Sequence, residues 1–314
     1  MNLAFLVGGI LLLIFGGDRL VNGAVALALR LNISRWIVGL TVVSFATSAP
    51  ELVVSLFAAI DGHPDISLGN VIGSNIANIA LVLAMVITLF GIHLEWKKVK
   101  IDVFAVLLTS IALTLVLFLD NGISRTAGVL LFTGLIAYIF YLIRGERKEG
   151  KAESVGEGHE QDPLWKSLLA LGLGGIALYF GSEGLIQGAV GLSRNLGISE
   201  RVISLTMVSV GTSIPELVAS IIAASKKEGS LSVGNLIGSN IFNVLSVLGL
   251  TAIIHPIQVQ DQGILGFDLW VMLGAVAGLF LLSLFGKSFW SNRLIAALIL
   301  MGYAVYIVSL FTGS

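Results

Sequence analysis

Ten long apolar blocks constrain the fold of this 314-residue chain more than any other feature of its sequence. Each block is close to the roughly 20 residues that an α-helix needs to cross a bilayer. Only 12% of the residues are charged, about half the share expected of a soluble domain. We therefore predict an all-α polytopic membrane protein with ten transmembrane helices. The predicted spans are approximately residues 3–27, 36–60, 66–92, 101–119, 127–143, 166–190, 201–224, 230–254, 264–286 and 293–312.

The basic residues predict the orientation of these spans. When the connecting segments are assigned alternately to the two sides of the membrane, fourteen Lys and Arg residues fall on one side and three on the other, with Arg19 inside the first block. Basic loops stay in the cytoplasm, so we expect both termini on the extracytoplasmic side of a cytoplasmic or inner membrane. The first block lacks the positive region of a signal peptide and is expected to be a retained helix.

The chain contains an internal duplication. Residues 44–51 match residues 209–216 at five of eight positions, and residues 69–78 match residues 234–243 at eight of ten. Both matches have the same offset of 165 residues, which indicates that one unit occurs twice.

Each copy holds an odd number of spans, and this determines how the copies lie in the membrane. With five spans per copy, the second copy must enter the membrane from the opposite side, so we predict two inverted five-helix repeats. The repeats are expected at residues 1–143 and 166–314, joined by a flexible cytoplasmic linker at residues 144–165. Inverted repeats are the architecture of secondary transporters, whose binding site lies near the bilayer midplane.

Two glutamates stand at matching places within predicted spans. Glu51 and Glu216 lie where an ionised carboxylate costs about 2.5–3.5 kcal/mol on insertion scales. An isolated acid that is neutralised by protonation is one explanation. Because the two acids are related by the duplication and have oxygen-bearing neighbours, we favour a cation site.

A proline precedes each glutamate. Pro50 and Pro215 lack an amide hydrogen, so the carbonyls of Ala46 and Gly211, four residues earlier, are expected to lose their helical partner. A broken helix at membrane depth is tolerated where the freed groups are buried in protein or line a cavity. A plain structural kink is the alternative, but the neighbouring hydroxyls favour a role in ligation. The residues that carry these hydroxyls are Thr47, Ser48, Thr212 and Ser213.

The second repeated motif adds neutral oxygens. Ser74 and Asn78 are four residues apart, as are Ser239 and Asn243, so each pair lies on one helical face and is expected to line the site. The same motif contains glycines at a Gly-x-x-x-Gly spacing, which are expected to allow close packing of helices. These glycines are Gly69, Gly73, Gly234 and Gly238.

This set of ligands indicates a hard cation. Calcium binds six to eight oxygens from carboxylates, carbonyls and hydroxyls, and the same oxygens can hold sodium. The chain has no cysteine, and its four histidines lie at or beyond span ends, which argues against a transition metal. It also argues against a hydrolase, because Ser48 and Ser213 have no histidine base within their spans. We expect no enzymatic activity and no cofactor, and a cation channel is the alternative from another class.

These paired motifs resemble the two alpha repeats of the sodium/calcium exchanger family, in the calcium/cation antiporter superfamily. The resemblance rests on residues 46–51 and 211–216, each followed by Gly-Asn-x-Ile-Gly-Ser-Asn-Ile-x-Asn, and covers essentially the whole chain, as in prokaryotic ten-helix members. It implies an electrogenic antiporter that exchanges about three sodium ions for one calcium ion by alternating access. The expected partners are these two ions and the lipid bilayer, without nucleic acid or an obligate protein partner.

The resemblance also implies a role for each site residue. Glu51 and Glu216 would be the carboxylate ligands shared by calcium and sodium. Backbone carbonyls would come from Thr47, Thr212, Ser44 and Ser209. Hydroxyls would come from Ser48, Ser213, Ser74 and Ser239, and the central position would be lined by Asn78 and Asn243. Helices one and six would slide across the core to switch access, and they carry Gly16, Gly23, Gly181 and Gly188.

Two further positions bear on coupling. In potassium-dependent relatives an Asp replaces one of the residues that match Asn78 and Asn243, so two asparagines predict no potassium dependence. The proton/calcium branch has a different motif, and a proton/calcium or other cation antiporter of the same fold is the alternative. Asp18 and Glu183 also match at the offset of 165, and a structural or gating role is expected for them.

Overall fold

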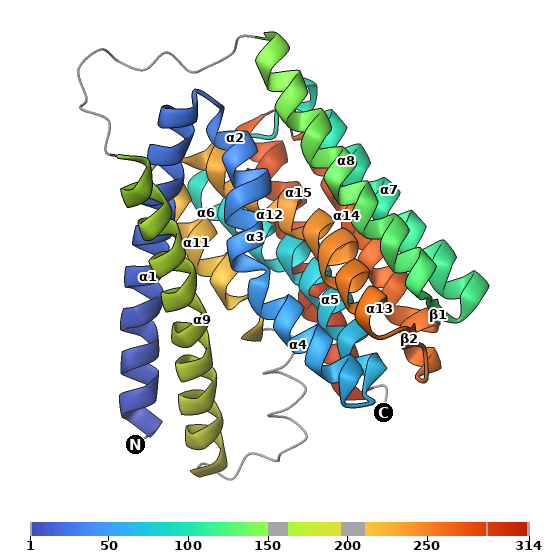
Figure 1. Cartoon of the computed structure of the whole chain (residues 1–314). Helices are drawn as coiled ribbons and strands as arrows, with labels where there is room; N and C mark the ends of the chain where they lie inside the picture. The colour runs from blue at the N-terminus through green and yellow to red at the C-terminus, as the bar shows by residue number, and fades with distance from the viewer. Residues whose placement is uncertain (1, 150–162, 196–210, 287, 313–314) are drawn as a thin grey trace. The chain divides into compact units, whose positions relative to one another are not determined.

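The computed structural model describes residues 2–149, 163–195, 211–286 and 288–312, and most of them are helical (Figure 1). The α-helices are α1 (Asn2–Leu31), α2 (Arg35–Val38), α3 (Ser44–Thr47), α4 (Ala49–Ile60), α5 (Pro64–Ile76), α6 (Ala84–Phe90), α7 (Trp96–Asp120), α8 (Arg125–Glu149), α9 (Leu164–Asn195), α11 (Ile214–Ser225), α12 (Gly229–Phe242), α13 (Gly249–Ile254), α14 (Leu269–Phe285) and α15 (Phe289–Thr312). The π-helical segments are η1 (Gly39–Val43), η2 (Ala77–Leu83), η3 (Asn243–Leu248) and η4 (Ile264–Asp268). The strands are β1 (Gly122–Ile123) and β2 (Ile257–Gln258).

The helices agree with the predicted spans. Among the described residues, eight helical stretches are long and apolar enough to cross a membrane, and the bent pair Arg35–Thr47 and Ala49–Ile60 makes nine. These nine coincide with nine of the ten predicted spans. The predicted span at residues 201–224 lies partly outside the described residues, and its described end is the apolar helix α11. Most of the predicted linker at residues 144–165 also lies outside them.

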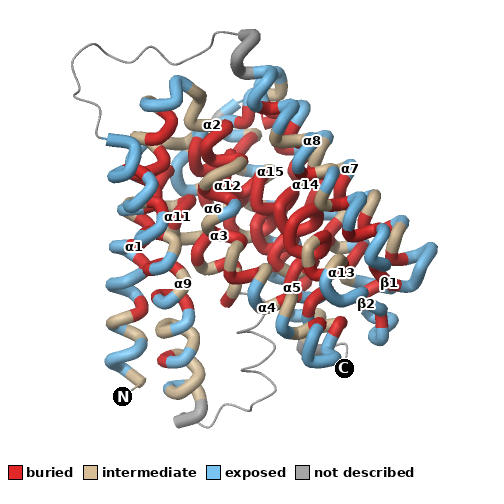
Figure 2. The backbone as a smooth tube through the Cα atoms, viewed as in Figure 1, coloured by how far each residue is buried: buried red, intermediate tan, exposed pale blue. Residues whose placement is uncertain are grey.

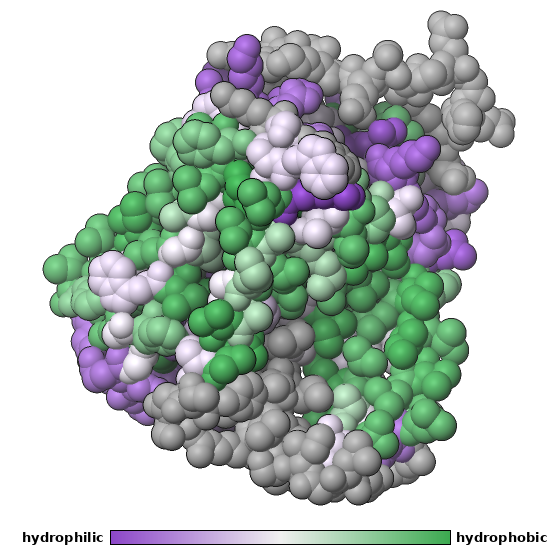
Figure 3. Space-filling model, turned by 180° about the vertical axis from the view of Figure 1, so that it is seen from behind, coloured by the Kyte–Doolittle hydropathy of each residue, from purple (hydrophilic) through white to green (hydrophobic). Residues whose placement is uncertain are grey.

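Burial divides the spans into two kinds. In the 18-residue apolar part of Pro64–Phe90 and of Gly229–Ile254, 78% and 83% of the residues are buried, whereas the corresponding share for Trp290–Leu310 is 11%. The tubes of α5 and α12 are accordingly mostly red in Figure 2. The less buried spans expose large apolar side chains, and hydrophobic residues predominate on the face shown in Figure 3. Such a surface suits hydrocarbon rather than water.

The contacts group the chain into two units, and each unit draws on both halves of the sequence. Unit 1 comprises Met1–Thr47 with Ala137–Gly238, and unit 2 comprises Ser48–Ile136 with Ser239–Ser314.

In unit 1, helices α1 and α9 lie side by side (Figure 1), and a line of glycines brings their backbones into close contact. A Cβ on Gly16 would lie 2.7 Å from the amide nitrogen of Leu178 and 2.8 Å from the carbonyl oxygen of Gly174. The helices are antiparallel, and each contributes three glycines at seven-residue intervals, which keep one seam facing the partner helix. These glycines are Gly9, Gly16, Gly23, Gly174, Gly181 and Gly188.

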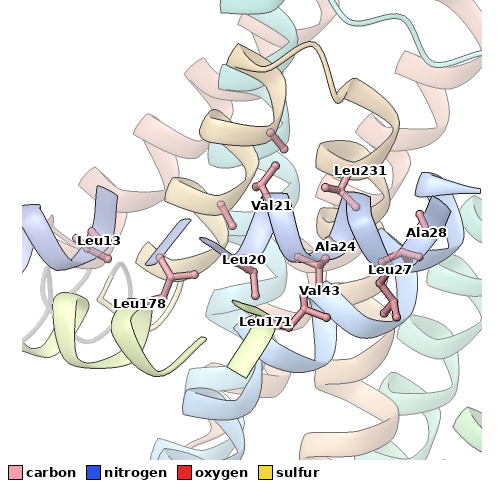
Figure 4. Packing of buried hydrophobic residues seen from close by; sticks show 13 residues of the cluster. Leu13, Leu20, Val21, Ala24, Leu27, Ala28, Val43, Leu171, Leu178 and Leu231 are labelled. Atoms are coloured by element: carbon pink, nitrogen blue, oxygen red, sulfur yellow. The ribbon is translucent and has the colours of Figure 1, made fainter. Parts of the chain in front are cut away.

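The rest of the unit 1 core is aliphatic. Figure 4 shows side chains of α1 interleaved with those of neighbouring segments, including Leu20 and Leu178, which are almost fully buried. Beside this core, the predicted packing role of two motif glycines is confirmed. A Cβ on Gly234 would lie 2.6 Å from the carbonyl oxygen of Trp36, and one on Gly238 would lie 2.5 Å from that of Leu40.

The other two motif glycines, in unit 2, have no such neighbour among the described residues. A Cβ on Gly69 or Gly73 would meet no described atom within 4 Å. The segment that covers Gly234 and Gly238 begins at Trp36, and its counterpart in the duplication falls at residues 201–209, outside the described residues. The packing role therefore stays a prediction for these two glycines.

Unit 2 contains a feature that the sequence did not predict, the antiparallel pair of β1 and β2. Gly122 pairs with Gln258 and Ile123 with Ile257. A Cβ on Gly122 would collide with the carbonyl oxygen of Ile257, so this position needs glycine. The side chain of Asn121 adds a bond from its Nδ2 to the carbonyl oxygen of Val259, at 3.3 Å. The turn after α7 is thereby tied to the segment that follows α13.

The two copies use different residues at one turn, and this difference leads to a stability prediction. Gly62 follows α4 with φ +82°, and its counterpart Lys227 follows α11 with φ +65°. The left-handed conformation costs an ordinary residue roughly 1–2 kcal/mol and glycine almost nothing. We expect Lys227→Gly to raise the free energy of unfolding of the detergent-solubilised protein by up to about 1 kcal/mol. The gain is limited because glycine also increases the conformational entropy of the unfolded chain. Thermal unfolding would measure the change, with Lys227→Ala as the control that removes the same side chain without relieving the left-handed conformation. Equal shifts for the two variants would contradict the explanation.

Candidate cation site

In both copies a break in helical geometry lies just before the proline. Ser48 separates α3 from α4 with φ −87° and ψ 2°, and Ser213 precedes α11 with φ −87° and ψ 3°. Pro50 and Pro215 then fall in the first turn of the new helix, where the missing amide hydrogen costs nothing. The two copies thus have the same local structure at this place.

The two glutamates follow these breaks and are completely buried. Glu51 lies in the first turn of α4, in unit 2, and Glu216 lies in the first turn of α11, in unit 1. Both have no exposed surface. The N-terminal end of a helix carries partial positive charge, which favours an anionic side chain there. The break therefore places each carboxylate where its charge is partly compensated by backbone.

In unit 1 the hydroxyls beside the first break are engaged by protein groups. The Thr47 hydroxyl donates to Oδ1 of Asn235 at 3.2 Å. The Ser44 hydroxyl lies 2.8 Å from the carbonyl oxygens of both Gly39 and Asn235. These contacts suit the expected ligation through the backbone carbonyls of Ser44 and Thr47 rather than through their hydroxyls.

The second break in unit 1 brings further polar groups close to Glu216 in sequence. Ser213 is 2% exposed, and its hydroxyl has no hydrogen-bond partner among the described residues. Thr212 is half-buried beside it. Ser209, the remaining predicted ligand of this copy, lies outside the described residues.

Unit 2 assembles predicted ligands from both halves of the chain. Helix α4, which carries Glu51, packs against η3, and so does α5, which carries Ser74. Asn243 is the first residue of η3. The predicted ligands of this unit are all at most 4% exposed, and they are Ser48, Glu51, Ser74, Asn78, Ser239 and Asn243.

The asparagines of this group differ in their bonding. Neither polar atom of the Asn78 side chain has a hydrogen-bond partner among the described residues. Asn243 donates from Nδ2 to Oδ1 of Asn75 at 3.1 Å, whereas its own Oδ1 is without a described partner. Both residues lie in π-helical turns, Asn78 in η2 and Asn243 in η3. Such turns are frequent at functional sites.

A set of buried residues that support the helices was missed at the sequence level. Asn235 donates from Nδ2 to the Ser220 hydroxyl at 3.2 Å, and its counterpart Asn70 donates to the Ser55 hydroxyl at 2.9 Å. Asn70 also donates to the backbone carbonyl of Glu51 at 3.2 Å. Each asparagine thus joins its own helix to the one that carries the glutamate. The duplication was the available signal, since both residues recur at the offset of 165.

Asp18 in α1 and Glu183 in α9, the acids of the first and sixth predicted spans, have local partners within unit 1. Lys226 donates to Asp18 and, at 2.7 Å, to Oδ1 of Asn22. Glu183 accepts from Nε2 of Gln187 at 2.7 Å. These contacts agree with the expected structural or gating role.

The donors of the candidate site are oxygens from carboxylates, hydroxyls, amides and backbone. In the described parts of the chain, no group of three or more His, Cys, Asp or Glu side chains is placed to hold a metal. Neutral oxygens would therefore supply most ligands. Such a set fits calcium or sodium as a transported ion, because hard cations prefer oxygen.

A family model described as sodium/calcium exchanger protein matches residues 1–144 and 166–312. The chain belongs to the sodium/calcium exchanger family. It is therefore a transporter of the antiporter type and not an enzyme, and the predicted all-α polytopic membrane fold is confirmed.

Individual relatives support the same membership over nearly the full length of this exchanger. It is 37% identical to the putative antiporter CaxA of Alkalimonas amylolytica, over 98% of each chain. It is 32% identical to the inner membrane protein YrbG of Escherichia coli, over 98% of this chain and 96% of that one. It is similar in structure to the sodium-calcium exchanger NCX_Mj, with a TM-score of 0.83 and 29% identity over 98% of each chain.

Proposed function

We propose that this exchanger is an electrogenic antiporter that moves about three sodium ions in exchange for one calcium ion by alternating access. The observation that carries the proposal is the pair of fully buried glutamates, Glu51 and Glu216, each in the first turn of a helix that follows the same break. Two carboxylates match the charge of one calcium ion, and the neighbouring oxygens are numerous enough to complete its shell.

In this proposal the glutamates are ligands of one shared ion, and the remaining positions keep the roles that the family resemblance implies. Carbonyl ligands come from Ser44, Thr47, Ser209 and Thr212. Hydroxyl ligands come from Ser48, Ser74, Ser213 and Ser239, and the amides of Asn78 and Asn243 line the centre. With an amide at both central positions, exchange is expected to be independent of potassium.

Buried charge couples the two ion fluxes. Without cations the two carboxylates would carry net negative charge through a medium in which an uncompensated charge is costly, so the switch between the two sides is favourable only with bound cations. A net movement of one charge per cycle is worth about 2.3 kcal/mol for each 100 mV of membrane potential. The seam between α1 and α9 suits these helices to move as one piece, because their backbones are in direct contact.

The topology is part of the proposal. We infer two inverted repeats at residues 1–143 and 166–314, a cytoplasmic linker at 144–165, and both termini outside a cytoplasmic or inner membrane. The asymmetry of the basic residues supports this orientation. No protein partner is needed for the cycle.

Radioactive calcium uptake into sodium-loaded proteoliposomes tests the proposal. On dilution into sodium-free buffer, we expect calcium uptake that requires internal sodium, is unchanged by potassium, and accelerates when the interior is made positive, since about three charges leave for each two that enter. Liposomes without protein are the control.

Other outcomes would replace the proposal with its rivals. Uptake that ignores sodium and follows a pH gradient would identify a proton-coupled antiporter of the same fold. Calcium flux without any countergradient and without saturation would identify a channel.

A further inference from the structure

The orientation of the candidate ligand Asn243 depends on a hydrogen bond with a second buried residue. The motif Gly-Ser-Asn-Ile-x-Asn occurs in both copies and supplies four asparagines to unit 2. All four are at most 1% exposed, and they are Asn75, Asn78, Asn240 and Asn243. Their polar atoms therefore need hydrogen-bond partners in the protein or in ordered water, or, for the oxygens, a bound cation.

A series of hydrogen bonds connects three of these asparagines. The Asn75 amide donates from Nδ2 to the backbone carbonyl oxygen of Asn240 at 3.2 Å. A carbonyl oxygen only accepts, so the nitrogen of the Asn75 amide must face it. Oδ1 of Asn75 then faces the other way, and there it accepts from Nδ2 of Asn243 at 3.1 Å.

These hydrogen bonds determine which atom of Asn243 is available to a cation. The amide nitrogen of Asn243 is held by Asn75, and its Oδ1 has no hydrogen-bond partner among the described residues. A cation binds the oxygen of an amide and not its NH₂ group, which is a donor. A reversed Asn243 would place its NH₂ group where the ion needs an oxygen.

Among the described residues, the second copy of the motif does not form the equivalent hydrogen bonds. Its counterpart would be a bond from Nδ2 of Asn78, but neither polar atom of Asn78 has a hydrogen-bond partner in the described part of the chain. The two amides at the centre are thus unequal. Among the described residues, Asn243 is held through its nitrogen and its oxygen has no partner, whereas Asn78 has no hydrogen-bond partner for either polar atom of its side chain.

We propose that Asn75 is a positioning residue that orients the Asn243 amide so that its oxygen faces the transported cation. The proposal rests on the proposed function, since it takes Asn243 to be a ligand. The Asn75 side chain acts through Asn243 and does not itself bind the ion.

The test compares Asn75→Leu with Asn240→Leu in sodium-dependent calcium uptake by the full-length protein. Both substitutions remove an equally buried asparagine of the same motif, but Asn75 donates to the backbone carbonyl of Asn240, which Leu retains. We expect Asn75→Leu to raise the half-saturating calcium concentration about tenfold, the effect of one lost buried hydrogen bond, with a maximal rate close to that of wild type. Asn240→Leu should stay within about threefold of wild type.

A double-mutant cycle separates positioning from general support of the fold. If Asn75 acts through Asn243, then Asn75→Leu should add almost nothing to Asn243→Ala, whereas independent effects would add. Additive effects, or equal effects of Asn75→Leu and Asn240→Leu, would overturn the inference. If Asn75→Leu does not yield folded protein, Asn75→Ser is measured in the same cycle, since its hydroxyl is too short to hold both partners.

Calcium binding to the purified wild-type protein, measured by calorimetry, distinguishes this inference from the proposed function. Sodium-dependent uptake by wild type together with additive variants would overturn the role of Asn75 alone. Absence of both calcium binding and sodium-dependent uptake in wild type would overturn the proposed function, and the inference with it.

Discussion

Glu51→Gln is expected to abolish sodium-dependent calcium uptake, and Glu216→Gln is expected to do the same. Glutamine keeps the size of the side chain but removes the charge that offsets a divalent ion in a fully buried site. We expect a loss of at least about 100-fold in the uptake rate at low calcium, which corresponds to about 2.7 kcal/mol. The measurement is uptake into sodium-loaded proteoliposomes, normalised to the amount of reconstituted protein.

Two controls make this result specific. Glu95→Gln is the same change at an exposed position, where the carboxylate pairs with Lys98 on the surface, and it should leave uptake unchanged. Glu183→Gln removes an acid from the span formed by α9 and should cost far less than either site variant. Wild-type uptake in Glu51→Gln or Glu216→Gln would refute the assignment of that glutamate.

Conservative variants give graded information on the same site. Glu51→Asp and Glu216→Asp keep the charge and shorten the side chain by one methylene group. We expect both to retain exchange with a raised half-saturating calcium concentration, because charge is preserved but the ligand distance is not. A complete loss in both would indicate that geometry outweighs charge.

Gly174→Leu is expected to prevent formation of the folded protein. A Cβ at this position would lie 2.5 Å from the amide nitrogen of Leu20 and 2.8 Å from the carbonyl oxygen of Gly16. These are backbone atoms, so α1 and α9 would have to separate. Even Gly174→Ala should cost about 1–3 kcal/mol by overpacking. Thermal unfolding and size-exclusion chromatography in detergent would measure both effects.

The matched control is Gly172, two residues earlier on the same helix. Gly172 is exposed, and a Cβ there would meet no described atom within 4 Å. Gly172→Ala should leave the protein as stable as wild type or more stable by up to about 1 kcal/mol, because alanine is the better helix former. Equal losses of stability at Gly172 and Gly174 would show that the seam is not the cause.

Much of the fold could be predicted because a bilayer imposes a simple rule on sequence. Spans such as those that became α7 and α15 need only length and apolar composition, so their positions were predicted to within a few residues. The strand pair at Gly122 could not be predicted in this way. It depends on pairing between residues 134 and 136 positions apart, and two-residue strands carry no sequence pattern that predicts such pairing.

The candidate site was predicted in its residue types but not in its supporting contacts. Glu51 stood out because an acid within an apolar block is costly, and the duplication pointed to Glu216. Asn70 and Asn235 have the same signal of duplication, yet nothing in the sequence separates a ligand from a residue that ties two helices together.

The difference in hydrogen bonding between Asn78 and Asn243 could not be predicted from the local sequence. The segments Gly73–Asn78 and Gly238–Asn243 differ only at Ala77 and Phe242, yet within the described part of the chain the side chain of Asn243 is hydrogen bonded and that of Asn78 is not. The difference comes from how each segment meets the rest of unit 2, which is tertiary information.

The glycine seam between α1 and α9 has a consequence for how the chain is made. Helix α1 ends at Leu31 and its partner begins only at Leu164, so the first helix enters the membrane long before the second has been translated. At about 5–20 residues per second, this interval is on the order of ten seconds. During that time the groove formed by Gly9, Gly16 and Gly23 faces lipid or the insertion machinery instead of α9. Biogenesis thus includes a waiting period for α1, and slowing translation before Leu164 would lengthen it.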